Sequence, residues 1–117
     1  MVDNDNGRVA SDIEIIVLNF LDKNNIVYEF QSSLMGGRFE LGGLIADILI
    51  PDLQLAWRIH GDYWHRQIGK TGQDIIQREL LEAEGWTVVD LYGSDLLNPE
   101  TREQTLIKAL HGEEMLQ

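Results

Sequence analysis

The sequence has no cysteine, and no apolar run in it approaches the length of a membrane-spanning helix. Without cysteine the chain has no disulfide, no thiolate zinc site and no cysteine nucleophile. The absence of cysteine also gives no indication of whether the protein works in a reducing or an oxidising compartment. The polar, acidic start MVDNDNGR is unlike a signal peptide. We therefore expect a cytoplasmic protein with no membrane association.

Positive charge is also scarce. Nine lysines and arginines stand against twenty aspartates and glutamates, which gives a formal net charge of −11. Nucleic-acid binders usually present a basic face, because the neutralisation of phosphates supplies much of their affinity. A function on DNA must therefore account for this deficit.

The rest of the composition is that of an ordinary globular chain. With 117 residues, 44% of them hydrophobic and 25% charged, the sequence is long enough for one domain around a single core. We expect residues 1–117 to form one domain, with residues 1–10 as a flexible leader and residues 112–117 as a short tail.

The stretch from Ala46 to His65 carries the strongest pattern. Two apolar runs flank Pro51-Asp52, which predicts a hairpin of two buried strands. The first run contains one acid, Asp47, while the second ends at His60 and is followed by His65. An acid that starts one strand and histidines that leave the next would lie near one edge of a sheet. Metal-dependent sites are commonly assembled in this way.

Helices and strands alternate along the rest of the chain. Ser11 and Glu14 form a capping-box pattern that begins a helix, and Asn24-Asn25 ends it. Residues 26–31 predict a strand, whereas residues 32–43 form a loop or two strand ends joined by a wide turn. The hairpin follows.

The second half of the chain predicts a helix, a strand and a last helix. Asp74 opens the first of these helices and Gly85 stops it, residues 86–92 form the strand, and Pro99 lies near the start of the last helix. The expected buried positions of the two helices are Ile75, Ile76, Leu80, Leu81 and Ala83, then Leu106, Ile107 and Leu110. The order α-β-β-β-α-β-α predicts an α/β (α+β) fold with a mixed four-stranded sheet flanked by helices.

The segment His60-Gly61-Asp62-Tyr63-Trp64-His65 resembles the His-Gly-Cys-Phe-Trp-His segment of the very-short-patch repair (Vsr) endonucleases. The similarity continues upstream in Asp47 and downstream in Asp74, Leu81 and the Gly85-Trp86-x-Val88 pattern, and covers roughly residues 14–97. The resemblance implies a restriction-endonuclease-like (PD-(D/E)XK) core and a DNA endonuclease. A group of homing endonucleases shares the same pattern of site residues.

The resemblance also implies a role for each matching residue. Asp47 and the backbone carbonyl of Ile59 would bind the metal, and His60 would support the scissile phosphate. His65 would activate the attacking water, Asp74 would orient His65, and Glu14 would hold metal-bound water. The chemistry of phosphodiester hydrolysis agrees, because it needs a hard cation such as Mg²⁺ (or Mn²⁺) and a base that is neutral near pH 7.

The chain departs from the Vsr pattern at three places. That family's structural zinc site uses cysteine, so no structural zinc is expected here. The segment between His65 and Asp74 is much shorter, which removes the basis for expecting mismatch specificity. Arg58 occupies the position of the usual second acid of the metal-binding strand.

Each candidate residue also has a structural interpretation. In this interpretation Glu14 is the acid of a capping box and Asp74 is the N-cap of its helix. Asp47 could point at solvent from a strand edge, although a lone acid in an apolar run favours a site. Either histidine alone is more often a packed or surface residue than a catalyst.

Two functions stay open at this point: a metal-dependent DNA endonuclease, and a non-catalytic member of the same fold that acts as an interaction or structural subunit. The net charge favours the second, and the retained site residues favour the first. DNA contacts would come from a local basic patch of Arg38, Arg58, Arg66 and Lys70, with Arg78 nearby. The acidic residues, Glu113 and Glu114 among them, would lie on other faces. A homodimer or a protein partner could supply further DNA affinity.

Overall fold

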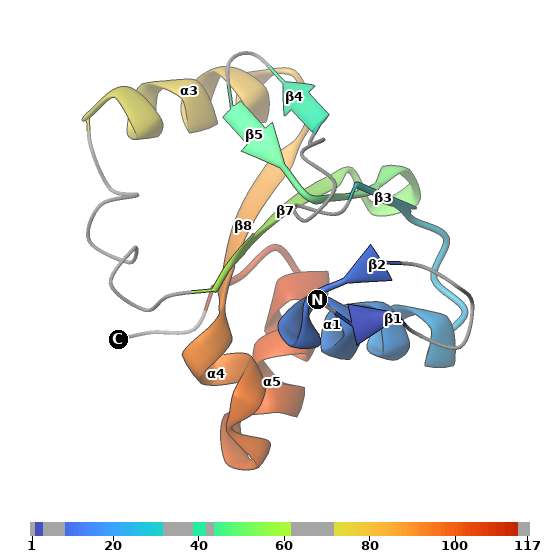
Figure 1. Ribbon diagram of the computed structural model, residues 1–117. Coiled ribbons are helices and arrows are strands. Elements are labelled where there is room, and N and C mark those ends of the chain that lie inside the picture. The colour runs from blue at the N-terminus through green and yellow to red at the C-terminus, as the bar shows by residue number, and fades with distance from the viewer. Residues whose placement is uncertain (1, 4–8, 32–38, 42–43, 62–71, 115–117) are drawn as a thin grey trace.

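The computed structural model describes residues 2–3, 9–31, 39–41, 44–61 and 72–114, and a mixed four-stranded sheet lies at its centre (Figure 1). Its strands lie in the order β3-β6-β7-β8. The bounds are β3 Glu29–Phe30, β6 Ile48–Ile50, β7 Leu55–His60 and β8 Thr87–Tyr92. The β3–β6 and β6–β7 pairs are antiparallel, whereas β7 and β8 run parallel. The predicted mixed four-stranded sheet is thereby confirmed.

Helices cover both faces of this sheet (Figure 1). One face packs on α1 (Asp12–Lys23), α4 (Gly93–Leu97) and α5 (Pro99–Leu110), and this side holds the larger core, with the fully buried Trp57 at its centre. The other face lies under α3 (Gly72–Ala83) and holds a smaller core. That smaller core consists of Ala46, Leu49, Ala56, Leu81 and Val88, with Trp86 against it.

The predicted helix boundaries of α1 are confirmed by its caps. Ser11 N donates to Glu14 Oε1 at 3.0 Å and Glu14 N donates to Ser11 Oγ at 3.3 Å, which is a complete capping box. The helix ends at the C-cap Asn24, and Asn25 turns the chain with a φ of 57°. Gly85 has a φ of +99°, so the predicted stop after α3 uses the left-handed conformation that glycine tolerates.

The hairpin around Pro51-Asp52 is also confirmed. A short 3₁₀ helix, η2 (Pro51–Leu53), joins β6 to β7, and Gln54 leaves it with a φ of 55°. Ile48 pairs with Trp57 and Ile50 with Leu55. The chain bends at Asp47, just before β6, and this bend places the acid against the far end of β7.

The second predicted helix differs from expectation in its start and in its buried face. α3 begins at Gly72, so Asp74 is its third residue and does not open it. Of the five apolar residues expected to be buried, Leu81 alone is; Ile75, Ile76, Leu80 and Ala83 are exposed. The reason is that, among the described residues, the apolar contacts of α3 are confined to the small core that Leu81 forms with Ala46, Leu49, Ala56 and Val88. On α5, Leu106 is buried as expected, whereas Ile107 is 43% exposed.

Three further features were not predicted. β1 (Val2–Asp3) pairs with β2 (Val9–Ala10), so the expected leader contains a two-stranded ribbon. β4 (Phe39–Leu41) pairs with β5 (Leu44–Ala46) in a second small hairpin, and α4 follows β8 directly. Within the described part of the chain, none of the helices is long and apolar enough to cross a bilayer.

Candidate active site

Buried carboxylates mark the candidate site. Among the described side chains, the buried polar or charged ones are Glu14, Asp47, Asp90 and Thr105. Three of these four are acids, and acids are seldom fully buried unless they are paired or functional. Two of them, Glu14 and Asp47, are residues that the sequence predicted for the site.

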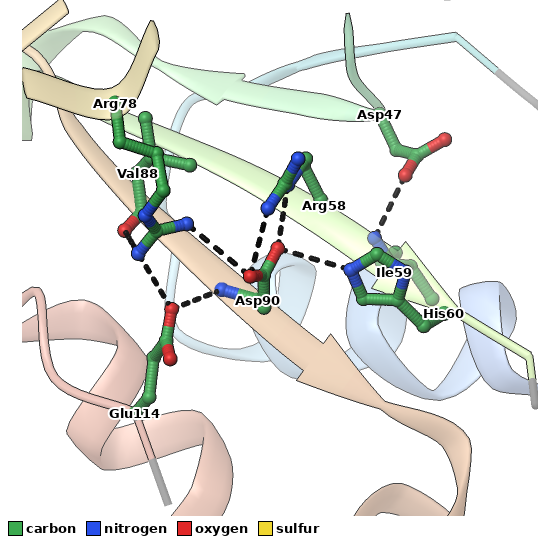
Figure 2. A network of polar contacts seen from close by, with 8 residues as sticks. All are labelled: Asp47, Arg58, Ile59, His60, Arg78, Val88, Asp90 and Glu114. Atoms are coloured by element: carbon green, nitrogen blue, oxygen red, sulfur yellow. Dashed lines mark hydrogen bonds and ion pairs between the residues drawn. The ribbon is translucent and has the colours of Figure 1, made fainter. Parts of the chain in front are cut away.

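Asp47 is held against the end of β7 from both its backbone and its side chain. Its N–H donates to Trp57 O at 2.9 Å, and its Oδ2 accepts from the backbone N of Ile59 at 2.7 Å (Figure 2). The side chain is 1% exposed. The β6–β7 ladder ends at the pair Ile48–Trp57, so β6 offers no backbone carbonyl to the N–H of Ile59. The Asp47 carboxylate accepts this hydrogen bond in its place.

The carbonyl of Ile59 lies on the same side of β7 as this contact. In an extended strand the N–H and C=O of one residue point to the same neighbour. Since the N–H of Ile59 meets Asp47, its carbonyl also faces the bend at Asp47 and not β8. The two predicted metal ligands, the Asp47 carboxylate and the Ile59 carbonyl, thus share one edge of β7. Both are hard oxygen donors, which suits Mg²⁺ or Mn²⁺.

Glu14 lies in the first turn of α1, which approaches the carboxyl ends of β7 and β8. Ile13 Cδ1, beside it in sequence, would lie 3.7 Å from a Cβ on Gly61 and 3.5 Å from one on Gly93. Gly61 and Gly93 directly follow β7 and β8, so this end of α1 is at the same end of the sheet as His60. Glu14 serves the capping box, and its role in holding metal-bound water stays a prediction.

A cluster of charged side chains on the α3 side of the sheet surrounds the third buried acid, Asp90 (Figure 2). Arg58 donates to it from Nε at 2.5 Å and from Nη2 at 2.8 Å. Arg78 Nη1 donates to Asp90 Oδ2 at 3.2 Å, and His60 Nε2 lies 3.0 Å from Oδ1. The strand register explains the meeting, because Arg58 is directly opposite Asp90, and His60, two positions further along β7 and on the same face, is opposite Tyr92.

Asp90 is ionised in this cluster. Burial by itself would raise the pKa of its carboxyl, but the hydrogen bonds from His60 and Arg58, with the charge of Arg58, hold that pKa well below its usual range. Sequence reasoning missed this residue. The available signal was an acid inside the apolar strand WTVVDLY, which is the argument that had identified Asp47.

Glu114 extends the cluster to the segment after α5. Its Oε1 accepts from Arg78 Nη2 at 2.8 Å and from the backbone N of Asp90 at 2.9 Å, while Arg78 Nη2 also donates to Val88 O at 3.0 Å. The expectation that Glu114 lies on a face away from the basic residues is therefore wrong. Arg58 and Arg78 are each paired with acids, because the sheet places Asp90 between them.

His60 is oriented by two neighbours. Its ring nitrogen Nε2 meets Asp90, and its ring stacks on Tyr92 with centroids 5.1 Å apart and planes inclined by 22°. The side chain is 20% exposed. The imidazole is thus mostly buried and held from two sides, but it keeps some access to solvent at the end of β7.

Several predicted site residues lie outside the described residues. These are Arg38, His65, Arg66 and Lys70, and of Asp74 only the backbone, inside α3, is described. Within the described ranges there is no group of three or more histidine and acidic side chains close enough to hold a metal ion. The roles given to these residues stay predictions, as does the DNA contact of Arg58, whose guanidinium pairs with Asp90.

Gly93 allows the start of α4 to approach the end of β7, so we expect Gly93→Ala to destabilise the fold by about 1–3 kcal/mol through overpacking. A Cβ at this buried position would lie 3.2 Å from Gly61 O and 3.3 Å from His60 O. Urea unfolding followed by tryptophan fluorescence measures the effect. Gly61→Ala is the matched control, because the nearest atom of the described residues to its Cβ would be Ile13 Cδ1, at an ordinary contact distance of 3.7 Å. Equal stability of the two variants would contradict this tight approach.

Comparison with known proteins bears on the fold. No family model matches the sequence, and no curated protein does. Among solved structures, the chain is similar to the "Homing Endonuclease I-Bth0305I Catalytic Domain", with a TM-score of 0.59 and 20% identity over 85% of this chain and 93% of that one. At this identity the likeness concerns the fold: the chain has the mixed sheet and flanking helices of that catalytic domain.

Proposed function

We propose that this chain is a metal-dependent DNA endonuclease with a Vsr-like site at the carboxyl end of β7. The observation that carries the proposal is the buried Asp47 carboxylate on the same edge of β7 as the Ile59 carbonyl, next to His60. The neighbour in fold, named as the catalytic domain of a homing endonuclease, supports the same function. DNA is then the substrate, and its phosphodiester bond is hydrolysed.

Asp47 and the carbonyl of Ile59 would hold Mg²⁺ or Mn²⁺, which when bound supplies charge stabilisation at the phosphate oxygens. A sparse protein ligand set of this kind is usual for Mg²⁺, since waters and substrate fill the remaining positions. His60 supports the scissile phosphate. His65 takes the proton of the attacking water, Asp74 orients His65, and Glu14 holds water at the site.

DNA affinity has to come from few cations. Arg58 and Arg78 are paired with Asp90 and Glu114, so their charges are largely compensated inside the protein. We propose that Arg38, Arg66 and Lys70 provide the phosphate contacts, with Arg58 as a further contact. A homodimer or a protein partner would add to this modest basic surface.

Relaxation of supercoiled plasmid at low salt tests the function. With Mg²⁺ or Mn²⁺ the wild-type chain is expected to nick the plasmid, and His65→Ala is expected to lower the rate by at least about 100-fold through loss of the base. His111→Ala is the matched control, because His111 is an exposed histidine at the end of α5. Folded wild-type protein that cleaves in neither metal would contradict the proposal and favour the non-catalytic alternative.

A further inference from the structure

We infer that Asp90 is a positioning residue that fixes the tautomer and the orientation of His60. The inference about the imidazole stands on the charged cluster itself. Its catalytic consequence rests on the proposed function, in which His60 supports the scissile phosphate. Neither the resemblance nor the comparisons assign any role to Asp90.

The ionised state of Asp90 decides which partner donates in its hydrogen bond with His60. An ionised carboxylate can only accept hydrogen bonds, and Asp90 already accepts from Arg58 and Arg78. His60 Nε2, at 3.0 Å from Asp90 Oδ1, must therefore be the donor. Neutral His60 then carries its proton on Nε2, and Nδ1 is left with the lone pair.

The Asp90 carboxylate and the imidazole of His60 are both held in place by neighbouring side chains. Asp90 is 2% exposed and cannot swing away, because the two-point pairing with Arg58 fixes the plane of its carboxylate. Tyr92 limits rotation of the imidazole by stacking on its face. A rigid acceptor and a stacked ring together leave His60 one favoured orientation.

The contact with Asp90 also determines the role of the second ring nitrogen of His60, Nδ1. Figure 2 shows the ring of His60 beside Asp90, with Nε2 turned toward that carboxylate. With the proton on Nε2 directed at Asp90, Nδ1 is the ring nitrogen that can accept a hydrogen bond in the neutral imidazole. Asp90 thereby prepares His60 in the way that the third member of a catalytic triad prepares its histidine.

Long-range ¹H–¹⁵N correlation spectra of histidine-labelled protein test the tautomer without any need for activity. The neutral imidazole of His60, assigned with His60→Gln, is expected to show the Nε2–H pattern alone. Asp90→Asn is expected to add the Nδ1–H pattern, because an amide can donate as well as accept. A wild-type spectrum of the Nδ1–H form, or an unchanged spectrum in Asp90→Asn, would overturn the inference.

Glu114→Gln is the matched control, since Glu114 belongs to the same cluster but accepts from Arg78 and from the backbone N of Asp90, on the opposite side of Asp90 from His60. It should leave the His60 spectrum unchanged. In plasmid nicking, Asp90→Asn should lower kcat about 10- to 100-fold with little change in KM, and Glu114→Gln should not. Equal kcat values for the two folded variants would refute the positioning role. If wild type does not nick, the proposed function fails while the spectra alone decide the contact between Asp90 and His60.

Discussion

Replacing Asp47 by asparagine is expected to lower the rate of metal-dependent DNA nicking by at least about 100-fold. The carboxamide removes the negative charge that would hold the metal ion. Its oxygen can still accept the 2.7 Å hydrogen bond from Ile59 N, so the end of β7 keeps its partner. We therefore expect the free energy of unfolding to change by no more than about 1 kcal/mol. Initial rates of plasmid nicking across a Mn²⁺ titration, with urea unfolding beside them, measure both quantities.

Asp52→Asn is the control for this variant. Asp52 lies in the same hairpin, in η2, but is exposed to solvent. The Asp52→Asn substitution makes the same chemical change at a site without a predicted role, so this variant should nick the plasmid at the wild-type rate. If Asp47→Asn also nicks at that rate, Asp47 only caps the backbone of Ile59 and the metal site lies elsewhere.

Replacing Asp90 by alanine is expected to destabilise the fold by about 3 kcal/mol, because it leaves Arg58 and Arg78 without their shared acid. That loss is a large part of the roughly 5–15 kcal/mol by which a domain is usually stable. Urea unfolding near neutral pH measures it. Asp52→Ala, an exposed acid, should change stability by less than about 0.5 kcal/mol.

The stability difference between wild type and Asp90→Ala is expected to depend on pH and to decrease in acid. The folded-state pKa of Asp90 is held below its usual range, so folding favours the ionised form. The stabilisation is fully present above the unfolded pKa of about 3.9, and it is lost as the pH falls below that value. The stability difference between wild type and Asp90→Ala should therefore be constant from pH 7 to pH 5 and narrow below about pH 4. A difference that widens in acid would contradict the ionised state of Asp90.

Local signals in the sequence predicted much of the fold. The capping box at Ser11, the hairpin around Pro51-Asp52 and the stop at Gly85 each depend on residues close together in the chain, and each is confirmed. The expected burial of Ile75, Ile76 and Leu80 is wrong, because the spacing of apolar residues in a helix does not show how much of that helix the rest of the fold covers. How much of a helix is covered depends on the sheet beneath it, and here the covered area is small.

The candidate site was predicted in part. The pairing of Asp47 with Ile59 was implied by the resemblance to the Vsr endonucleases, and the structure places both at one end of β7. The cluster at Asp90 could not be predicted, because it joins Arg58, Arg78 and Glu114 across separations of 32, 12 and 24 residues. Such pairings depend on the strand register and on the path of the chain after α5. Arg58 looked like a DNA contact in the sequence because its acid partner lies on another strand.

The side chains beside β8 also restrict how this protein could assemble. Among the described strands, β8 lies at one edge of the sheet, and such edges are the places where a second chain can add a strand. Here Glu114 accepts from the N–H of Asp90, and Arg78 donates to the carbonyl of Val88. A second copy could extend the sheet at these residues only by breaking the contacts that also fix the charged cluster. A homodimer would therefore associate through a helical surface or through another edge, and its formation would leave the centre of β8 unchanged.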